Sequence, residues 1–467
     1  MRGALGGRHL GACVVVAGLA ASPAAAAPNT VAGALATWTK KHPDTGALVV
    51  RLGPTGSHTL ASHRPDLPHM PASTMKVVTS AGALLAMGPN FRFQTTLLEG
   101  PGTVRKGSTL TGPVYLKGSG DPVLATRTYA RTYLGRYHTD LGALARALRA
   151  RGVTRHTGPT VVDPTVLDGR RTGLQWRSYY WQYSPPLSGA AVNQNYAGDN
   201  RARYARNPDR GAASHLARVF RANGIRNTGP VRVARTPTRA RVLATVQSPP
   251  LSMILRAMNP DSDNFIAETL RKDVGAYAGG QGTTAEGNRV TTILLRDRGI
   301  MGPSDVLVDG SGLSRANKVS ATTLVSIFEA AYREPAWGDG LVLSLPTGGT
   351  GTLVRRFREP GIRARVRAKT GYINGVSSLA GVATSPSGER YAFAFVMNDA
   401  DIGGAKATQD RIVKLLASGR ADFLPGVPRP APAPRMSTTT SPGSLTPPAG
   451  ATTTRTNATE HGRARVP

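Results

Sequence analysis

Apolar positions along the chain recur with helical spacing in some segments and alternate as in strands in others. The clearest case follows Pro71, where the apolar residues from Val77 to Leu85 predict a helix over residues 73–87. Three strand-like runs also come close together near the end of the sequence. The expected helices are residues 31–41, 73–87, 263–270, 284–298, 321–333 and 405–417, and the expected strands are 46–52, 57–62, 306–308, 362–368, 376–384 and 390–397. Helices that flank a terminal antiparallel sheet predict an α/β sandwich.

Between residues 93 and 249 the pattern changes to short β-rich runs separated by Gly/Pro turns. The runs 112–117, 159–162 and 231–234 alternate with two helical stretches, 141–151 and 214–223. No chemical motif was found in this segment. The pattern predicts a β-rich insertion of one or two domains. It divides the α/β domain into a first part, residues 27–92, and a second part, residues 250–424.

The two ends of the chain differ in composition from the rest. Residues 1–26 carry Arg2 and Arg8, then an apolar stretch and a run of alanines, which predicts a signal peptide cleaved after Ala26. A membrane anchor is the alternative, but about twelve apolar residues are too few to span a bilayer. Residues 425–467 are rich in Pro and Thr and predict a disordered tail. We therefore expect an exported, extracytoplasmic protein, either held in the cell wall or secreted.

Composition narrows the range of partners and cofactors. The single cysteine, Cys13, lies inside the predicted signal peptide, so the mature chain is expected to have no disulfide and no thiol ligand. Basic residues number 58 against 27 acidic ones, a formal charge of +31. They are scattered, with no arginine- and aromatic-rich segment, so nucleic acid is not expected as a partner. Peripheral contact with an anionic envelope and simple solubilisation of the surface are both consistent with this charge. The histidines include no His-x-x-x-His pair, and no metal or other cofactor is expected.

Three short polar motifs supply the candidate chemistry. Together they offer a hydroxyl nucleophile, a base and a cation for a substrate carboxylate, which indicates acyl transfer to a serine. Each motif alone arises easily by chance, but their order along one chain is strong evidence. The motifs are Ser73-Thr74-Met75-Lys76, Ser262-Asp263-Asn264 and Lys369-Thr370-Gly371.

Ser73 and Lys76 are three positions apart on a predicted helix, so their side chains should share one face. A serine hydroxyl becomes a good nucleophile only when a base removes its proton. Lys76 can be that general base if desolvation or a second cation, here Lys369, lowers its pKa. A solvated surface lysine would be the simpler interpretation of an isolated Ser-x-x-Lys, and the other two motifs favour catalysis.

The second motif can present two side chains to one cleft, because Ser262 and Asn264 lie two positions apart. We expect Ser262 to relay a proton to the leaving amine and the Asn264 amide to hold the peptide group of the substrate. Asp263 should face inward and anchor the loop. A structural role as helix cap, for Asp261 or Ser262, can coexist with these roles.

The third motif lies on a predicted strand, where Lys369 and Gly371 face one side and Thr370 the other. Lys369 would supply charge for a substrate carboxylate, and the Thr370 hydroxyl would contact the same group. Gly371 would leave room for the substrate backbone. The backbone N–H groups of Ser73 and Tyr372 are predicted to form an oxyanion hole.

At these motifs the chain resembles the serine D-alanyl-D-alanine carboxypeptidase/endopeptidase family, the low-molecular-mass class C penicillin-binding proteins. The resemblance covers about residues 31–420. The separation of Ser73 from Ser262 (262 − 73 = 189 positions) matches the large insertion of that family. Tyr372 departs from the usual Thr or Ser, which puts the recognition of the carboxylate in question. Further similar segments are Gly118–Pro122, Ala267–Leu270, Asp309–Asn317 and Gly375–Gly381.

The resemblance implies a transpeptidase-like domain of the penicillin-binding-protein/β-lactamase type. It implies a serine peptidase in which Ser73 attacks the bond between two D-alanines of a peptidoglycan stem peptide and β-lactams acylate the same serine. D,D-endopeptidase activity on cross-links could accompany this reaction. A β-lactamase or esterase on the same scaffold is an alternative, opposed by the long insertion and by the lack of a Glu-x-x-Leu-Asn element soon after Ser262. A non-catalytic envelope-binding protein is another, opposed by the intact motifs.

Overall fold

The computed structural model describes residues 30–421. The predicted signal peptide, residues 1–26, and the predicted tail, residues 425–467, lie outside the described residues, so both stay predictions. None of the helices within 30–421 has the length and hydropathy needed to cross a membrane.

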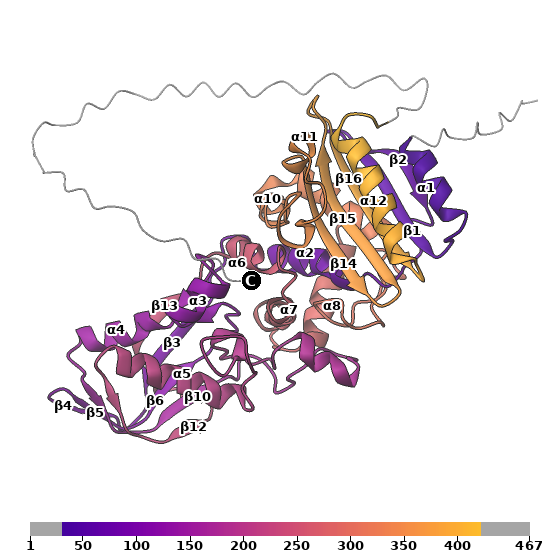
Figure 1. Ribbon diagram of the computed structural model, residues 1–467. Helices are drawn as coiled ribbons and strands as arrows, with labels where there is room; N and C mark the ends of the chain where they lie inside the picture. Colours follow the sequence, from indigo (N-terminus) through magenta and orange to yellow (C-terminus); the bar gives the residue numbers. More distant parts are fainter. Residues whose placement is uncertain (1–29, 422–467) are drawn as a thin grey trace, which may run out of the picture. The chain divides into compact units, whose positions relative to one another are not determined.

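One five-stranded antiparallel sheet joins the two ends of the described chain (Figure 1). Its strand order is β14-β15-β16-β1-β2, so the first strand of the sequence pairs with the last. The prediction of a terminal antiparallel sheet is confirmed, although the strand expected at 362–368 begins and ends later. The strands are β1 (Thr45–Leu52), β2 (His58–His63), β14 (Val366–Ile373), β15 (Val376–Thr384) and β16 (Arg390–Asn398).

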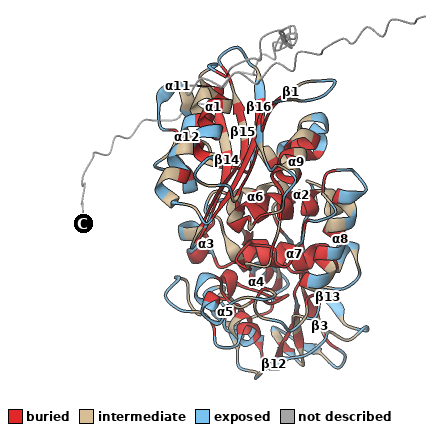
Figure 2. Ribbon diagram, turned by 90° about the vertical axis from the view of Figure 1, so that its right-hand side faces the viewer, coloured by how far each residue is buried: buried red, intermediate tan, exposed pale blue. Residues whose placement is uncertain are grey.

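Helices cover both faces of this sheet, because successive side chains of a buried strand point to opposite sides. Phe393 and Phe395 of β16 pack in one buried cluster with α1 (Val31–Thr39) and α12 (Ile402–Ala417). Ala392 and Ala394 of the same strand pack in the larger cluster on the other face. Figure 2 shows that α2 and α7, which belong to this second layer, are almost wholly buried. The helices there are α2 (Met75–Met87), α6 (Leu251–Met258), α7 (Asn264–Ala278), α8 (Thr284–Arg296), α9 (Ala321–Arg333) and α10 (Pro335–Val342).

The prediction of a strand at 306–308 is wrong. Only an isolated bridge joins Val306 to Lys318. The next N–H groups, of Val308 and Asp309, donate to the Asn317 side-chain oxygen at 2.8 and 3.2 Å instead of to a strand. A side-chain amide thus satisfies the donors that a β-ladder would need, and the segment forms a loop.

Residues 94–247 form sheets of their own. The larger has the order β12-β10-β6-β3-β13 and encloses a separate buried cluster with α4 (Gly142–Ala150) and α5 (Pro208–Ala222). Apolar residues at and beside α3 (Arg127–Tyr133) belong instead to the main cluster and fasten the insertion to α2 and α7. The strands are β3 (Gln94–Glu99), β6 (Val114–Lys117), β10 (Thr160–Asp163), β12 (Val231–Val233) and β13 (Arg241–Gln247), with shorter ones at β4 (Val104–Lys106), β5 (Thr109–Thr111), β7 (Leu124–Ala125), β8 (Thr139–Asp140), β9 (Arg155–His156) and β11 (Arg226–Asn227).

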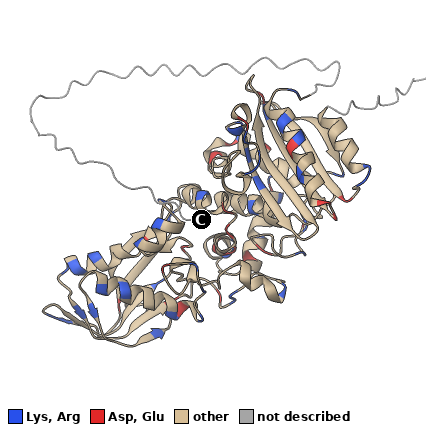
Figure 3. Cartoon of the chain, in the orientation of Figure 1, with Lys and Arg blue, Asp and Glu red and all other residues tan. Residues whose placement is uncertain are grey.

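Basic side chains are spread over the insertion, with fewer acidic ones among them (Figure 3). They lie on α4, α5 and the small strands, not in one groove. A spread of this kind makes a diffuse positive field.

A close approach of two backbones fixes the position of Ser73. Gly312 has φ +87°, and a Cβ at this position would lie 1.8 Å from the carbonyl oxygen of Ala72. Only glycine tolerates both conditions. The loop after residue 309 can therefore press directly against the turn that carries Ser73.

We expect Gly312→Ala to lower the free energy of unfolding by roughly 1–3 kcal/mol, because it adds a strained φ and a backbone clash. Chemical denaturation would measure the loss. Gly361→Ala is the matched control, since a Cβ there meets nothing within 4 Å and should change stability little. Equal stability of the two variants would contradict this account of the contact.

Candidate active site

Ser73 lies in a single 3₁₀ turn, Ala72–Thr74, immediately before α2. The predicted α-helix thus begins at Met75 rather than at Ser73. Ala72 has φ +46°, a left-handed value that non-glycine residues rarely adopt. The turn is held in place because the Thr74 and Ser378 hydroxyls both donate to the Pro71 carbonyl, at 2.7 and 2.6 Å.

Lys76 is fully buried, and its ammonium group has three acceptors. Nζ donates to the Ser73 hydroxyl at 3.1 Å, to the Asn264 side-chain oxygen at 2.7 Å and to the Ser311 carbonyl at 2.8 Å. The sequence placed Ser73 and Lys76 on one face, and they are in hydrogen-bond contact. The Ser311 carbonyl was not anticipated.

Burial lowers the pKa of Lys76 to about 8, although Asp309, Glu268 and Asp263 oppose the shift. Desolvation destabilises the charged form, and the three carboxylates stabilise it. The net effect leaves a sizeable neutral fraction near physiological pH. A neutral amine beside a serine hydroxyl can accept its proton.

The second motif meets the third through Ser262. This residue has φ +57°, and its hydroxyl accepts a hydrogen bond from Lys369 Nζ at 2.9 Å. Lys369 also donates to the Thr370 carbonyl at 2.8 Å. The left-handed turn at Ser262 aims its hydroxyl toward the sheet, and strain of this kind is common at functional sites.

The cap of α7 is Asp263, not Asp261 or Ser262 as the sequence suggested. Its carboxylate accepts hydrogen bonds from the Ile266 N–H at 2.9 Å and from the Gln194 amide at 2.8 Å. It therefore does face inward and anchor the loop. Gln194 belongs to the insertion, so this one carboxylate ties helix and insertion together.

Lys369 is also fully buried, and its pKa lies well below the ordinary lysine value because of burial and then of repulsion by Lys76. No carboxylate pairs with it in the described chain. A substrate carboxylate bound here would stabilise the ammonium form and raise this pKa. The position suits a group that gains its charge partner only when substrate is present.

Asn264 has both ends of its amide occupied. Its oxygen accepts from Lys76, and its Nδ2 donates to the Tyr183 carbonyl at 2.9 Å. The predicted contact with a substrate peptide group would compete with this second bond. The amide therefore links the buried lysine to the insertion.

The space beside Gly371 in which a side chain would lie is taken up by the turn that carries Ser73, and the predicted room for substrate backbone stays a prediction. A Cβ there would lie 2.0 Å from the Ser378 hydroxyl, 2.7 Å from the Pro71 carbonyl and 3.0 Å from the Ser73 nitrogen. The glycine lets β14 approach the turn that carries Ser73. A larger residue would push the third motif away from the first.

The edge of β14 is open beside Ser73. The Ala368 N–H and the Val366 carbonyl bond to residues 346–348, on the side away from β15. Because backbone groups alternate along a strand, the Tyr372 N–H and the Thr370 carbonyl point to that same side. That the Tyr372 and Ser73 N–H groups form a pair of oxyanion donors stays a prediction, with which this side of the strand is consistent.

A cavity of about 300 Å³ opens above these groups. Tyr179, Tyr180 and Tyr183 from the insertion form part of its lining, together with Arg177 and Arg315. The insertion, in which the sequence showed no chemical motif, therefore contributes side chains to the lining of the site. The aromatic run Tyr179–Tyr183, which includes the exposed Trp181, was the signal that could have found it.

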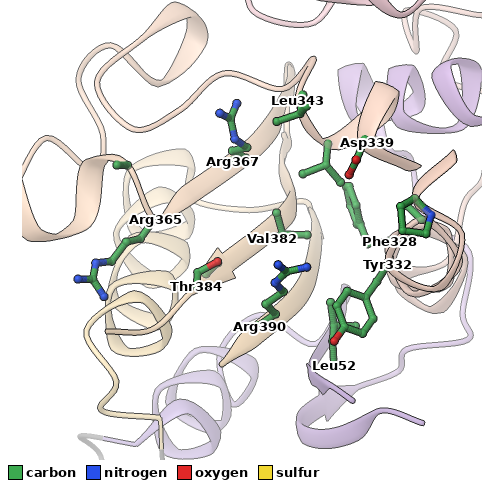
Figure 4. Close-up of a pocket in the computed structure, with 15 residues that line it drawn as sticks. Leu52, Phe328, Tyr332, Asp339, Leu343, Arg365, Arg367, Val382, Thr384 and Arg390 are labelled. Atoms are coloured by element: carbon green, nitrogen blue, oxygen red, sulfur yellow. The ribbon is translucent and has the colours of Figure 1, made fainter. Parts of the chain in front are cut away.

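Within residues 30–421, no three His, Cys, Asp or Glu side chains are grouped so as to hold a metal ion. A second pocket, of about 270 Å³, lies between α9, α10 and the ends of β14–β16 (Figure 4). Arg365, Arg367 and Arg390 lie around an apolar floor there, and Arg390 stacks on Tyr332. None of the residues that line this pocket lines the Ser73 cavity.

The model of the D-Ala-D-Ala carboxypeptidase 3 (S13) family matches residues 33–203 and 194–418. The chain belongs to this family. A carboxypeptidase of Mycobacterium tuberculosis is 33% identical over 87% of both chains. A D-alanyl-D-alanine carboxypeptidase of Actinomadura is 29% identical over 74% of this chain and 77% of its own.

The fold agrees with this membership. Penicillin-binding protein 4 from Haemophilus influenzae superposes with a TM-score of 0.69 at 24% identity, covering 83% of this chain and 99% of the other. The same protein in complex with a β-lactam gives a TM-score of 0.64 at 25% identity, with the same coverage. The predicted penicillin-binding-protein fold is confirmed, and the S13 chain is a serine-type D-Ala-D-Ala carboxypeptidase.

We expect the rate of acylation of this S13 enzyme to rise with pH about a midpoint near 8, because only neutral Lys76 can accept the Ser73 proton and burial places its pKa there. The second-order rate constant for acylation by benzylpenicillin, measured from pH 5.5 to 9.5, would show this rise as the ascending limb of the pH profile. A rate that is already maximal at pH 6 would contradict Lys76 as the base.

Proposed function

We propose that the enzyme removes the terminal D-alanine of peptidoglycan stem peptides through an ester formed on Ser73. The observation that carries this proposal is the pair of contacts from lysine to serine, Lys76 to Ser73 at 3.1 Å and Lys369 to Ser262 at 2.9 Å. Ser73 and Ser262 both line one cavity beside the open edge of β14. Nucleophile, base and proton relay are thus within reach of one scissile bond.

In the first step, Ser73 Oγ attacks the carbonyl carbon of the D-Ala–D-Ala bond while Lys76 Nζ takes the hydroxyl proton. The oxyanion that forms accepts hydrogen bonds from the Ser73 and Tyr372 N–H groups. Ser262 then passes a proton to the leaving nitrogen and is reprotonated with the proton that Lys76 took, so Lys76 is neutral again and Lys369 keeps its charge for the substrate carboxylate. Free D-alanine departs, and water later cleaves the ester on Ser73.

Recognition of the terminal carboxylate is assigned to Lys369 and the Thr370 hydroxyl. Lys369 is a buried basic residue that pairs with no carboxylate among residues 30–421, and Thr370 follows it on the open strand edge. Tyr372, which is 57% exposed, replaces a small hydroxyl residue at the mouth of the cavity. Carboxylate binding then relies on one hydroxyl from the strand instead of two.

The β-lactamase alternative lacks a base for the attacking water. The one glutamate soon after Ser262, Glu268, is fully buried, and one carboxylate oxygen accepts the N–H groups of Gly310 and Ser311. We therefore propose that β-lactams act as covalent inhibitors that leave slowly. The β-lactam complex of the Haemophilus relative supports acylation of this kind.

Incubation with benzylpenicillin should add one inhibitor mass to the wild-type protein and none to Ser73→Ala, as intact-mass spectrometry would show. The adduct should persist for many minutes, because no carboxylate is placed to activate water. An unmodified wild type would overturn the mechanism. Rapid adduct loss with continuing penicillin hydrolysis would favour the β-lactamase, and cleavage of muropeptide dimers would show endopeptidase activity in addition.

We also propose that the protein is exported and acts outside the cytoplasm, in the cell wall or after secretion. The basic, apolar and alanine-rich order of residues 1–26 supports this. The net charge of +31 would draw the protein toward an anionic envelope, and the spread of basic side chains over the insertion suits such diffuse contact.

N-terminal sequencing of the protein recovered from outside the cells should begin at Ala27, because cleavage after Ala26 follows the alanine-rich site. Replacing apolar residues of the 10–21 stretch by charged ones should leave the full-length chain inside the cell. Recovery of the chain outside the cell with Met1 intact would contradict a cleaved signal.

A further inference from the structure

Three buried charged side chains near Lys76 take no part in the proposed proton transfers. Glu268 and Arg271 project from α7, and Asp309 belongs to the loop that follows Val308. All three side chains are almost or completely inaccessible to solvent. Charges buried to this degree are costly unless they are paired or hydrogen-bonded, so their contacts indicate what they do.

Glu268 holds the backbone that faces Lys76. Its Oε1 accepts the Gly310 N–H at 3.1 Å and the Ser311 N–H at 2.8 Å. The adjacent carbonyl of Gly310 accepts from the Thr79 hydroxyl at 2.6 Å, and Thr79 in turn accepts from Arg271 at 2.9 Å. The peptide between residues 310 and 311 is therefore fixed at both its N–H and its C=O.

The next carbonyl along this backbone is the one that Lys76 contacts. The Ser311 oxygen accepts from Lys76 Nζ at 2.8 Å, so the orientation of this carbonyl decides where the ammonium group sits. Nζ also donates to the Ser73 hydroxyl at 3.1 Å. The Ser311 carbonyl belongs to the 311–312 peptide, whose Gly312 N–H donates to Asp309 Oδ1 at 2.7 Å. Glu268 therefore acts on this carbonyl through the adjoining 310–311 peptide.

We propose that Glu268 is a positioning residue of the acylation step: it aims the Ser311 carbonyl at Lys76, and its charge controls how readily Lys76 gives up its proton. The proposal rests on the proposed role of Lys76 as the general base. Glu268 touches neither substrate nor Ser73 and acts only through the Gly310–Ser311 backbone and the field at Nζ.

The charged neighbours determine the sign of the electrostatic effect. Lys76 faces Glu268, Asp309 and Asp263, which raise its pKa, and it also lies near Lys369, whose own pKa is lowered by burial and by the charge of Lys76. Burial and then Asp309 raise the pKa of Glu268 to about 7, so Glu268 is mostly ionised at pH 8.

Arg271 and Lys272 are the cations on the other side of Glu268, and it stabilises the charged form of both. Removing the negative charge at position 268 would take away support for the Lys76 ammonium. The pKa of Lys76 would fall, and the ascending limb of acylation would move to lower pH.

The two functions of Glu268 can be separated by substitution. Its Oε2 has no hydrogen-bond partner, so a glutamine can keep Oε1 on both N–H groups and place its NH₂ at the free position. Glu268→Gln thus removes charge and keeps positioning, whereas Glu268→Ala removes both. Asp305→Asn is a matched control, because Asp305 is a buried carboxylate that accepts the Ser320 N–H at 2.8 Å and contacts no residue of the site.

The experiment is the pH profile of acylation by benzylpenicillin for these variants, with melting temperatures measured alongside. Glu268→Gln should keep the maximal rate within about threefold and shift the ascending limb down by about half a pH unit or more. Glu268→Ala should lose about tenfold or more of the maximal rate while still binding the drug non-covalently. Asp305→Asn should lower the melting temperature and leave the limb where it was.

An unshifted limb in Glu268→Gln would overturn the electrostatic part, and a wild-type maximal rate in Glu268→Ala would overturn the positioning part. If Glu268→Ala does not fold, Glu268→Gln provides the test, because glutamine is expected to keep the Oε1 contacts and the maximal rate. A tenfold fall of the maximal rate in Glu268→Gln would then overturn the positioning part. Failure of the underlying mechanism looks different, because a wild type without a limb near pH 8, or Lys76→Ala with undiminished acylation, would remove Lys76 as the base.

Discussion

Two lysines buried side by side are the constraint on which the site depends. Taking an ammonium group out of water is costly, and a second cation nearby adds to the cost. Lys76 has three acceptors and nearby carboxylates, whereas Lys369 has only a hydroxyl and a carbonyl. The imbalance makes the ammonium form of Lys369 the less stable of the two, so an incoming substrate carboxylate is the partner that would stabilise it.

The surrounding structure allows this arrangement through close backbone approach. Gly312 lets its loop touch the Ala72 carbonyl, and Gly371 lets β14 reach the turn of Ser73. Left-handed backbone at Ala72 and Ser262 then turns the two serines toward the cavity. At these four positions the backbone conformation decides whether the three motifs can meet, and only Ser262 among them also has a chemical role.

The insertion completes the site as well as separating two motifs in the sequence. Its Tyr183 carbonyl holds the Asn264 amide, and its Gln194 amide holds the Asp263 cap. The start of α7 is thus bonded to the insertion on two sides. The Asn264 amide contacts both the insertion and Lys76. A movement of the insertion would therefore displace this amide and change the surroundings of the Lys76 ammonium group.

The sequence alone determined the α/β sandwich, the family and the three motifs, because helical and strand periodicity and ordered polar residues are local patterns. It also placed Ser73 and Lys76 together, since three residues on a helix define one face. It misjudged the cap of α7 and missed the contact of Gly371 with the turn of Ser73, the Ser311 carbonyl, the role of Glu268 and the tyrosines of the insertion. Those features depend on backbone groups and on segments far apart in the chain. Only tertiary packing decides which of them meet, and only the burial it creates sets the pKa values on which the chemistry relies.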